Sequence, residues 1–423
     1  MRRNKRRQSL KSGNIKRNTS ISFISMKFNT RTSTRLPLPE TTARAHSRLL
    51  CARINAALEE ANGWLPFDRY MEYALYTPDF GYYCSGAHPF GHCARNGSDF
   101  ITAPELSPLF ARPLACAIEA ALDASNTCEV MEFGAGSGLL AAQLLDALGA
   151  QCARYTIVEL SGGLRARQQA TLAERAQRFA SRVRWLGTLP DAFEGVIVGN
   201  EVLDAMPIRL FARRENQWFE RGVTRDQPLF RWLDRPVDLD QWPHELMELL
   251  YSIDGHHDYL AEFHQAARAW TRTVCAMLAR GAALLLDYGF PRREYYHPQR
   301  SQGTLMCHYR HHAHPDPFFW PGLQDITAHV DFSGIADAAL ATGAELLGYT
   351  SQARFLINSG IADALAELDP LEPARFLPAA NTVHKLLSEA EMGELYKVIG
   401  FGRGIDQSAL DFAFATGDRS QCL

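Results

Sequence analysis

Glycine occupies every second position in the segment from Gly134 to Gly138, directly after Glu132-Phe133. Gly134, Gly136 and Gly138 follow a short apolar run and precede a leucine-rich run. A strand, a glycine-rich turn and a helix in this order let the backbone approach a ligand closely at the helix N-terminus. A dinucleotide site would need its third glycine one position later, where Leu139 stands, and no Gly-Lys-Ser/Thr of a phosphate loop follows.

Acidic residues accompany this glycine segment. Glu132 lies two residues before the first glycine, and Glu159 stands near the end of the next apolar run, residues 155–160. A carboxylate at the end of a second strand can accept both hydroxyls of a ribose. We therefore expect a nucleoside ligand without phosphates, such as S-adenosylmethionine, although an ordinary tight turn and a helix-capping role for Glu159 remain as alternatives. The expected ligand contacts here are Glu132, Gly134, Gly136, Gly138 and Glu159.

Two carboxylates follow the most apolar run of the sequence, residues 195–199. Glu201 and Asp204 stand three residues apart, so we expect them on one side of a helical turn. Such a pair can hold a guanidinium by bidentate hydrogen bonds. Because an arginine side chain stays protonated, chemistry at its nitrogen requires a site that orients the lone pair and stabilises charge. The alternative is that both carboxylates only cap a helix that begins at Asn200.

Two further polar segments are candidates for the same site. Residues 97–105 precede a predicted helix and can close over the ligand, so we expect contacts from Gly97, Thr102 and Pro104; a plain loop with Ser/Thr capping is the alternative. Five histidines lie between residues 308 and 329, but they lack the regular spacing of a zinc site, so we expect no metal. His329 is a candidate for proton transfer.

The elements that position these residues follow a doubly wound pattern. Apolar strand-sized runs alternate with helical runs, which predicts an α/β fold with a buried parallel sheet and right-handed crossovers. Residues 41–125 show no alternating strand pattern and predict a mostly helical N-terminal cap before a ligand-binding domain at 126–423. Residues 211–270 interrupt the alternation as an insertion after the fourth strand, with a hairpin at 211–223 that turns near Arg221-Gly222, followed by helices. The predicted strands are residues 128–133, 155–160, 183–186, 195–199 and 282–287.

Charge is unevenly distributed along the 423 residues. Residues 1–39 hold eleven Lys or Arg and no acidic residue, whereas the remainder holds 33 basic and 47 acidic residues. An acidic body argues against nucleic acid as a partner and suits a cationic protein substrate. We expect residues 1–40 to be a disordered basic extension, either a transit peptide or a segment outside the fold. No apolar run reaches the length of a membrane span.

Taken in order, these segments resemble the MidA-like family of class I methyltransferases, which includes the mitochondrial complex I assembly factor that methylates protein arginine. The resemblance covers roughly residues 45–360 and departs at the basic extension and at residues 84–95. The resembling segments are residues 70–83, 97–107, 132–138, 158–159, 200–207, 286–289, 303–305 and 325–332.

This resemblance implies a Rossmann-like, seven-stranded sheet, S-adenosylmethionine as donor and a protein arginine as acceptor, in mitochondrial members a respiratory-complex subunit. We assign Asn200 to the cofactor and Glu201, Asp204 and His329 to catalysis. The alternatives are a small-molecule or carboxyl O-methyltransferase and an assembly factor that binds the donor without turnover. The expected location is the cytoplasm if the protein is bacterial, or the mitochondrial matrix if the basic extension is a transit peptide. The oligomeric state is left open.

Overall fold

A computed structural model describes residues 36–85, 101–226, 229–237 and 242–423. Contacts between residues divide the chain into a short unit, Met1–Leu38, and a large unit, Pro39–Leu423. All elements below belong to the large unit. The expected basic extension lies almost entirely outside the described residues, and so does Gly97.

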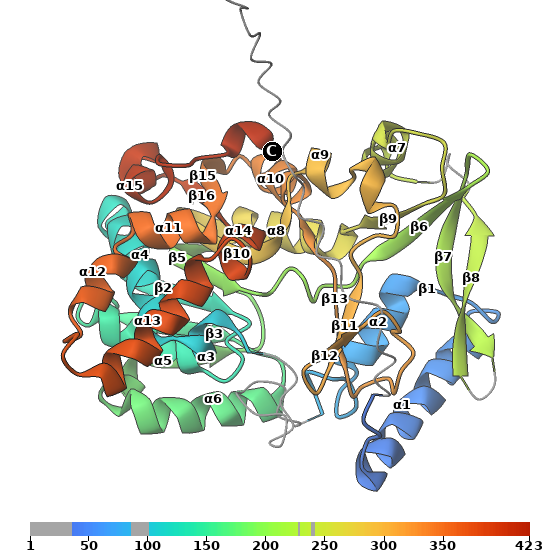
Figure 1. The fold of residues 1–423 in the computed structure, drawn as a ribbon, viewed down its shortest axis with the longest axis horizontal. Coiled ribbons are helices and arrows are strands. Elements are labelled where there is room, and N and C mark those ends of the chain that lie inside the picture. The colour runs from blue at the N-terminus through green and yellow to red at the C-terminus, as the bar shows by residue number, and fades with distance from the viewer. Residues whose placement is uncertain (1–35, 86–100, 227–228, 238–241) are drawn as a thin grey trace, which may run out of the picture. The chain divides into compact units, whose positions relative to one another are not determined.

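The large unit is built on the predicted α/β sheet (Figure 1). Its strand order is β15-β16-β10-β5-β2-β3-β4, with the short β14 (Val330–Asp331) paired to the end of β10. Strands β4, β3, β2, β5 and β10 run parallel, and β16 runs antiparallel to both of its neighbours. All five predicted strands are confirmed. The strands are β2 (Glu129–Phe133), β3 (Arg154–Val158), β4 (Val183–Leu186), β5 (Phe193–Asn200), β10 (Leu278–Phe290), β15 (Glu345–Ser351) and β16 (Tyr396–Arg403).

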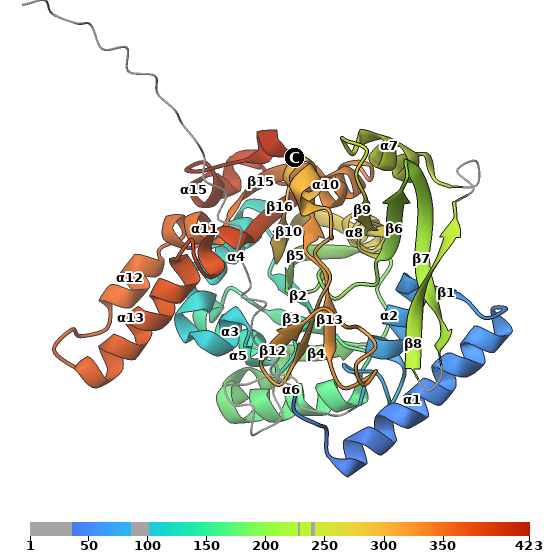
Figure 2. The ribbon, with the colours of Figure 1, turned by 45° about the vertical axis from the view of Figure 1, so that its right-hand side comes forward.

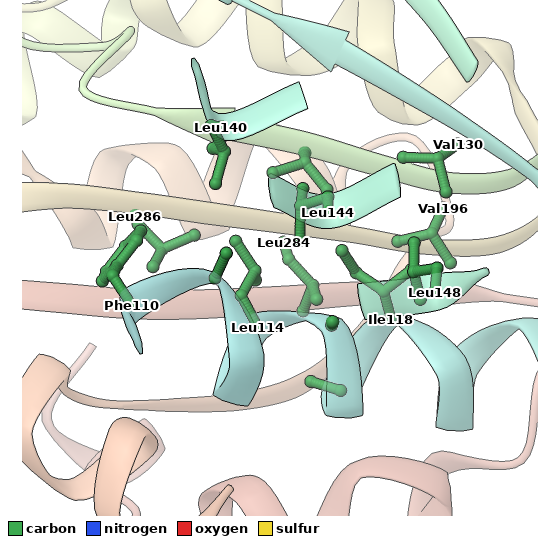
Figure 3. Close-up of a cluster of buried hydrophobic side chains, with 14 of the residues drawn as sticks. Phe110, Leu114, Ile118, Val130, Leu140, Leu144, Leu148, Val196, Leu284 and Leu286 are labelled. Carbon is green, nitrogen blue, oxygen red and sulfur yellow. The ribbon is translucent and has the colours of Figure 1, made fainter. Parts of the chain in front are cut away.

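Helices cover both faces of this sheet. On one face, α4 (Ala111–Ser125) and α5 (Leu139–Leu148) pack leucine and isoleucine side chains against Val130, Val196 and Leu284 (Figure 3). The other face carries α8 (Gln265–Met277) and α10 (Phe332–Leu340). Fully burying one such aliphatic side chain contributes about 1.5–3 kcal/mol. Although we grouped α4 with the N-terminal cap, its apolar face packs on the sheet, so the cap proper ends before it.

The N-terminal helices and the insertion together form the cap. Helices α1 (Thr41–Glu60) and α2 (Phe67–Tyr76) pack against a second sheet of order β1-β7-β6-β9, with β8 added at β7. Its first strand comes from the N-terminal segment and the others from the insertion (Figure 1). The described part of residues 41–125 is itself mostly helical, as expected, and the two-residue β1 is the strand it contributes. The strands are β1 (Leu65–Pro66), β6 (Arg209–Arg214), β7 (Gln217–Asp226), β8 (Leu229–Pro236) and β9 (Tyr259–Phe263).

The predicted hairpin exists, but its turn was misplaced. Strands β6 and β7 are joined at Glu215-Asn216, which have φ values of 50° and 63°. A two-residue hairpin turn of this type needs positive φ at both positions, and asparagine tolerates it well. Gly222, predicted near the turn, instead lies inside β7, where an added Cβ would come within 2.3 Å of the Leu65 carbonyl oxygen. The glycine there permits the cap strands to approach closely.

The remaining elements are a small separate sheet, a helix of the insertion and a helical arm. A small sheet of β11 (Met306–Tyr309), β12 (His312–His314) and β13 (Asp325–Thr327) lies between β10 and β14 in sequence. Helix α7 (His244–Ser252) belongs to the insertion. Between β15 and β16, α11 (Gln352–Asn358), α12 (Ile361–Ala366) and α13 (Pro373–Leu387) form a helical arm (Figure 2). Within the described ranges, no helix combines the length and apolarity that crossing a membrane requires.

Candidate active site

A pocket of about 600 Å³ opens where β2, β3, β4 and β5 end. The carboxyl ends of parallel strands share one edge of the sheet, so the loops that follow them meet there. The pocket is lined by residues of all four loops, by α8 through Ala266 and Trp270, and by the cap. Predicted site residues that line it are Thr102, Pro104, Glu132, Gly134, Gly136, Glu159, Asn200, Glu201 and Asp204.

The glycine loop after β2 adopts the conformation that its sequence requires. Gly134, Gly136 and Gly138 have φ values of 67°, 51° and 81°, in the region that favours glycine. A Cβ on Gly134 would lie 2.7 Å from Cγ2 of Val202, which belongs to the loop after β5. Gly138 does not line the pocket. It begins α5, and a Cβ there would lie 3.0 Å from the Cα atom of Gln168.

Gln168 connects the glycine loop to the predicted ribose ligand. Its Nε2 donates to Oε2 of Glu159 over 2.9 Å and to the Gly136 carbonyl over 3.3 Å, while Trp185 Nε1 donates to its Oε1 over 3.0 Å. The other Glu159 oxygen accepts from the Ser161 backbone N–H over 2.7 Å. Burial raises the pKa of Glu159. Gln168 fixes the carboxylate relative to the glycines, and sequence reasoning missed it on a helix that otherwise looks exposed.

Glu132 and the segment before α4 complete the cofactor side of the pocket. Glu132 is buried and accepts from the Tyr155 hydroxyl over 2.8 Å, and burial raises its pKa to about 7. Thr102 and Pro104 line the pocket as predicted. The helix α3 (Ala103–Leu106) is tied to the glycine loop by a hydrogen bond from Ser137 to the Glu105 carboxylate. This segment therefore lies over the glycine loop.

The loop after β5 is held by a carboxylate from the neighbouring strand β10. Oδ2 of Asp287 accepts from the backbone N–H groups of Val202, Leu203 and Asp204 over 3.1, 2.8 and 3.3 Å. The expected helical turn is absent: residues 201–206 form bends and turns, and Glu201 has a φ of 53°. Asp287 takes the N–H groups that a first helical turn would leave unpaired, and the chain then extends into β6.

Glu201 and Asp204 both line the pocket, each anchored by one tyrosine. The Tyr396 hydroxyl donates to Oε2 of Glu201 over 3.3 Å, and the Tyr288 hydroxyl donates to Oδ2 of Asp204 over 2.6 Å. Oδ1 of Asp204 is buried and has no hydrogen-bond partner among the described residues. Burial, reinforced by the Asp204 charge, raises the pKa of Glu201 to about 8, and burial also raises the pKa of Asp204.

Asn200 stands beside this pair. Its Nδ2 donates to Oε1 of Glu201 over 3.1 Å, whereas its Oδ1 is buried without a hydrogen-bond partner among the described residues. Asn200 therefore offers a buried acceptor to a ligand in the pocket.

The ionisable side chains of the described pocket lining include acidic residues and no basic ones. None of the described residues that line the pocket is lysine, arginine or histidine. Carboxylates concentrated in a cleft attract cations and raise their local concentration. The lining carboxylates are Glu105, Glu132, Glu159, Glu201, Asp204 and Asp325.

His329 lies behind the pocket lining and not in it. Its ring is edge-on to Tyr288 at 5.3 Å and tilted against Phe290 at 5.4 Å. Burial lowers the pKa of His329 to about 3, so the imidazole is neutral and a weak base. The structure does not bring His329 together with Glu201 and Asp204, and its contact with the site runs through Tyr288.

The structure also brings into the pocket residues that the sequence analysis did not assign to the site. Tyr76 and Tyr83 come from the cap, Asp325 from the small sheet and Trp270 from α8. Residues 67–83 are rich in aromatic side chains. Hydrophobic periodicity does not tell which of these rings face a ligand.

The strand order and the loops that meet at this edge define a class I methyltransferase. The sequence model of a family of S-adenosyl-L-methionine-dependent methyltransferases matches residues 111–350. The chain belongs to this family. It is similar to a COG1565 superfamily structure from Burkholderia thailandensis bound to S-adenosyl-homocysteine, with 59% identity and a TM-score of 0.87 over 92% of this chain and 100% of that one.

Curated relatives agree with this assignment. The mitochondrial protein arginine methyltransferase NDUFAF7 of Danio rerio is 28% identical over an alignment of 374 residues that covers 80% of this chain and 83% of the relative. The Homo sapiens protein of the same name is 25% identical over an alignment of 367 residues that covers 80% of each chain. The chain is therefore a methyltransferase of the MidA-like family, and its cofactor is S-adenosylmethionine. The residues present fit that cofactor, because Gly134 and Gly136 leave room for it and Glu159 stands at the end of the second strand.

Proposed function

We propose that this methyltransferase acts on a guanidinium nitrogen of arginine in a protein. The observation that carries the proposal is the pair formed by the half-buried Glu201 and the buried Asp204, in a pocket whose described lining holds six carboxylates and no cation. A planar cation that forms bidentate hydrogen bonds complements such a pair, whereas a neutral or anionic acceptor does not. The names of the relatives, at 25–28% identity, support the same acceptor.

The proposed roles follow from the atoms that remain available. S-adenosylmethionine, when bound, supplies an electrophilic methyl group. On this proposal, the glycine loop and Glu159 hold the adenosine part, and the buried Oδ1 of Asn200 accepts a hydrogen bond from the donor's amino group. Asp204 uses its unpartnered Oδ1 to accept an N–H of the guanidinium and orient a nitrogen lone pair towards the methyl group. Because the acceptor is protonated before and after transfer, one proton must leave, and the Glu201–Asp204 pair takes it. Positioning and electrostatics then provide most of the acceleration.

The proposed partner is a protein with an accessible arginine. We propose the cytoplasm of a bacterium as its location, because the relative at 59% identity comes from Burkholderia thailandensis. The mitochondrial matrix is the alternative, because the curated relatives are named as mitochondrial proteins. Fractionation of the source cells followed by immunoblotting distinguishes the two.

The acceptor is tested by incubating the purified protein with methyl-labelled S-adenosylmethionine and an extract of its source organism. Mass spectrometry of the labelled product is expected to place the methyl group on arginine, in a bond that is stable to mild base. Label that mild base releases as methanol identifies a carboxyl ester and contradicts the proposal. Label on a small molecule contradicts it too. Cofactor binding without any label transfer supports an assembly factor instead.

The rate of methyl transfer is expected to rise with pH and to level off above about pH 8. Burial and the charge of Asp204 raise the pKa of Glu201 to about 8, so this carboxyl is protonated below that pH and can accept a proton only above it. The arginine acceptor stays protonated across the range. Measuring kcat/KM for an arginine peptide from pH 6 to pH 9, with cofactor affinity determined in parallel, checks this. A rate that falls with pH would show that no carboxyl of the pair accepts the proton.

A further inference from the structure

We infer that Tyr76 and Tyr83 form an aromatic platform that holds the cationic acceptor group against Asp204. This inference rests on the proposed function and deepens it, because it names residues that select the acceptor. Together with Cys84, these two tyrosines are the described residues through which the segment around α2 lines the pocket. Asp204 and Asp325 line the same pocket.

The two rings form a fixed pair. Their centroids are 5.6 Å apart and their planes differ by 22°, which is an offset stack. The Tyr76 hydroxyl donates to the Ala205 carbonyl over 2.8 Å, and the Tyr83 hydroxyl donates to Oδ1 of Asp325 over 2.8 Å. Since both hydroxyls are engaged, the rings are held in place before any ligand arrives. Ala205 directly follows Asp204, so the first of these bonds places the platform beside the acceptor carboxylate.

Electrostatic neighbours show which end of the pocket the platform occupies. Burial raises the pKa of Tyr76 and Tyr83, and the charges of Asp325 and Asp204 raise both further. Burial also raises the pKa of Cys84, and there the added charges are those of Glu159 and Asp79. The hydrogen bonds of Tyr76 to Ala205 and of Tyr83 to Asp325 place the tyrosine pair at the Asp204 end. The platform belongs to the acceptor half of the pocket.

A ring face and a carboxylate together recognise a guanidinium well. The ring attracts a cation through its quadrupole, by an amount that grows when water is excluded. A guanidinium can stack on an aromatic face and still donate in its own plane to a carboxylate oxygen. Oδ1 of Asp204 is the unpartnered acceptor at that position. Because the rings are already ordered, little conformational entropy is lost on binding.

The test uses the full-length protein saturated with S-adenosyl-homocysteine, with N-acetyl-arginine amide as the cationic probe and N-acetyl-citrulline amide as its neutral isostere. Calorimetry is expected to give about tenfold weaker binding of the arginine probe to Tyr76→Leu and to Tyr83→Leu. Tyr76→Phe keeps the ring and retains most of the affinity. Stepwise fluorination of a phenylalanine at position 76 weakens the ring quadrupole and lowers arginine affinity at each step, which a purely structural role would not produce. Tyr73→Leu, on the same helix but outside the pocket lining, is the matched control and leaves arginine affinity unchanged.

Several results overturn the inference. Arginine affinity that is unchanged in both leucine variants, with S-adenosyl-homocysteine affinity also unchanged, shows that the rings do not hold the acceptor. Weaker binding of S-adenosylmethionine but not of S-adenosyl-homocysteine shows that they face the sulfonium instead. Failure of the proposed function gives a different result from these two. In that case the wild-type protein itself methylates no arginine and binds arginine no better than citrulline.

Discussion

The Asp204→Asn variant is expected to bind S-adenosyl-homocysteine normally and to lose about a hundredfold or more of its methyl-transfer rate. The change keeps the size of the side chain. It also keeps an oxygen for the Tyr288 hydroxyl, which in the wild-type protein donates to Oδ2 of Asp204 over 2.6 Å. It removes the charge that we assign to orienting the guanidinium and to accepting the proton. Single-turnover kinetics with an arginine peptide measure the loss, and calorimetry measures cofactor affinity.

Two further variants make this prediction specific. Asp123→Asn neutralises an exposed carboxylate on α4 and is expected to leave the rate unchanged. Glu201→Gln is expected to lose a similar factor, and the double variant is expected to lose less than the product of the two factors, because residues that act as a unit are not additive. A wild-type rate in Asp204→Asn would remove this carboxylate from the mechanism.

The Gly134→Ala variant is expected to lose about a hundredfold of its affinity for S-adenosyl-homocysteine. A residue with a Cβ at a φ of 67° costs about 1–3 kcal/mol in strain. In addition, the new Cβ would stand 2.7 Å from Cγ2 of Val202. The Val202 backbone is held by Asp287, so the loop after β5 cannot retreat freely and the glycine loop must shift into the cofactor site. Calorimetry gives the affinity, and thermal unfolding gives the strain.

A second glycine with positive φ serves as a control that distinguishes backbone strain from the steric contact with Val202. Gly63 has a φ of 82° and an added Cβ there meets no atom within 4 Å, so Gly63→Ala is expected to lose stability but keep wild-type cofactor affinity. Val202→Ala in the Gly134→Ala background removes the colliding methyl groups and is expected to restore part of the affinity. If Gly134→Ala binds the cofactor as tightly as wild type, the contact with Val202 does not shape the site.

Local patterns were sufficient to predict the five parallel strands of the central sheet and the cofactor loop, but they did not locate β14, β15 and β16. Buried parallel strands such as β5 are continuous apolar runs, and the alternate glycines mark a turn that only they can form. The sheet of the cap was not predictable in this way. Its strand β1 has two residues and acquires its identity only by pairing with Gly222 and Val223, far away in sequence. Periodicity within a window carries no information about such a partner.

The same reasoning explains the residues of the site that were missed or displaced. Gln168 is the buried polar residue of its helix, and only its contacts with Gly136 and Glu159 reveal a role. Tyr76 lies on the amphipathic helix α2, and strands of the insertion pack against the buried face of this helix. His329 has a side chain suited to proton transfer, but the packing of Tyr288 and Phe290 around it keeps it out of the pocket. Residue type alone predicts possible chemistry and not the direction of a side chain.

During synthesis on the ribosome, β1 cannot pair until β7 has been made. Leu65 and Pro66 emerge early, but their partners Val223 and Gly222 follow after roughly 150 further residues, which takes about 8–30 s at ordinary elongation rates. During that interval α1 and α2 expose the apolar surface that the insertion later covers, and this makes the nascent chain a client for chaperones. A pulse of nascent-chain crosslinking is expected to capture chaperones on chains shorter than about 220 residues and to lose them once β7 has emerged.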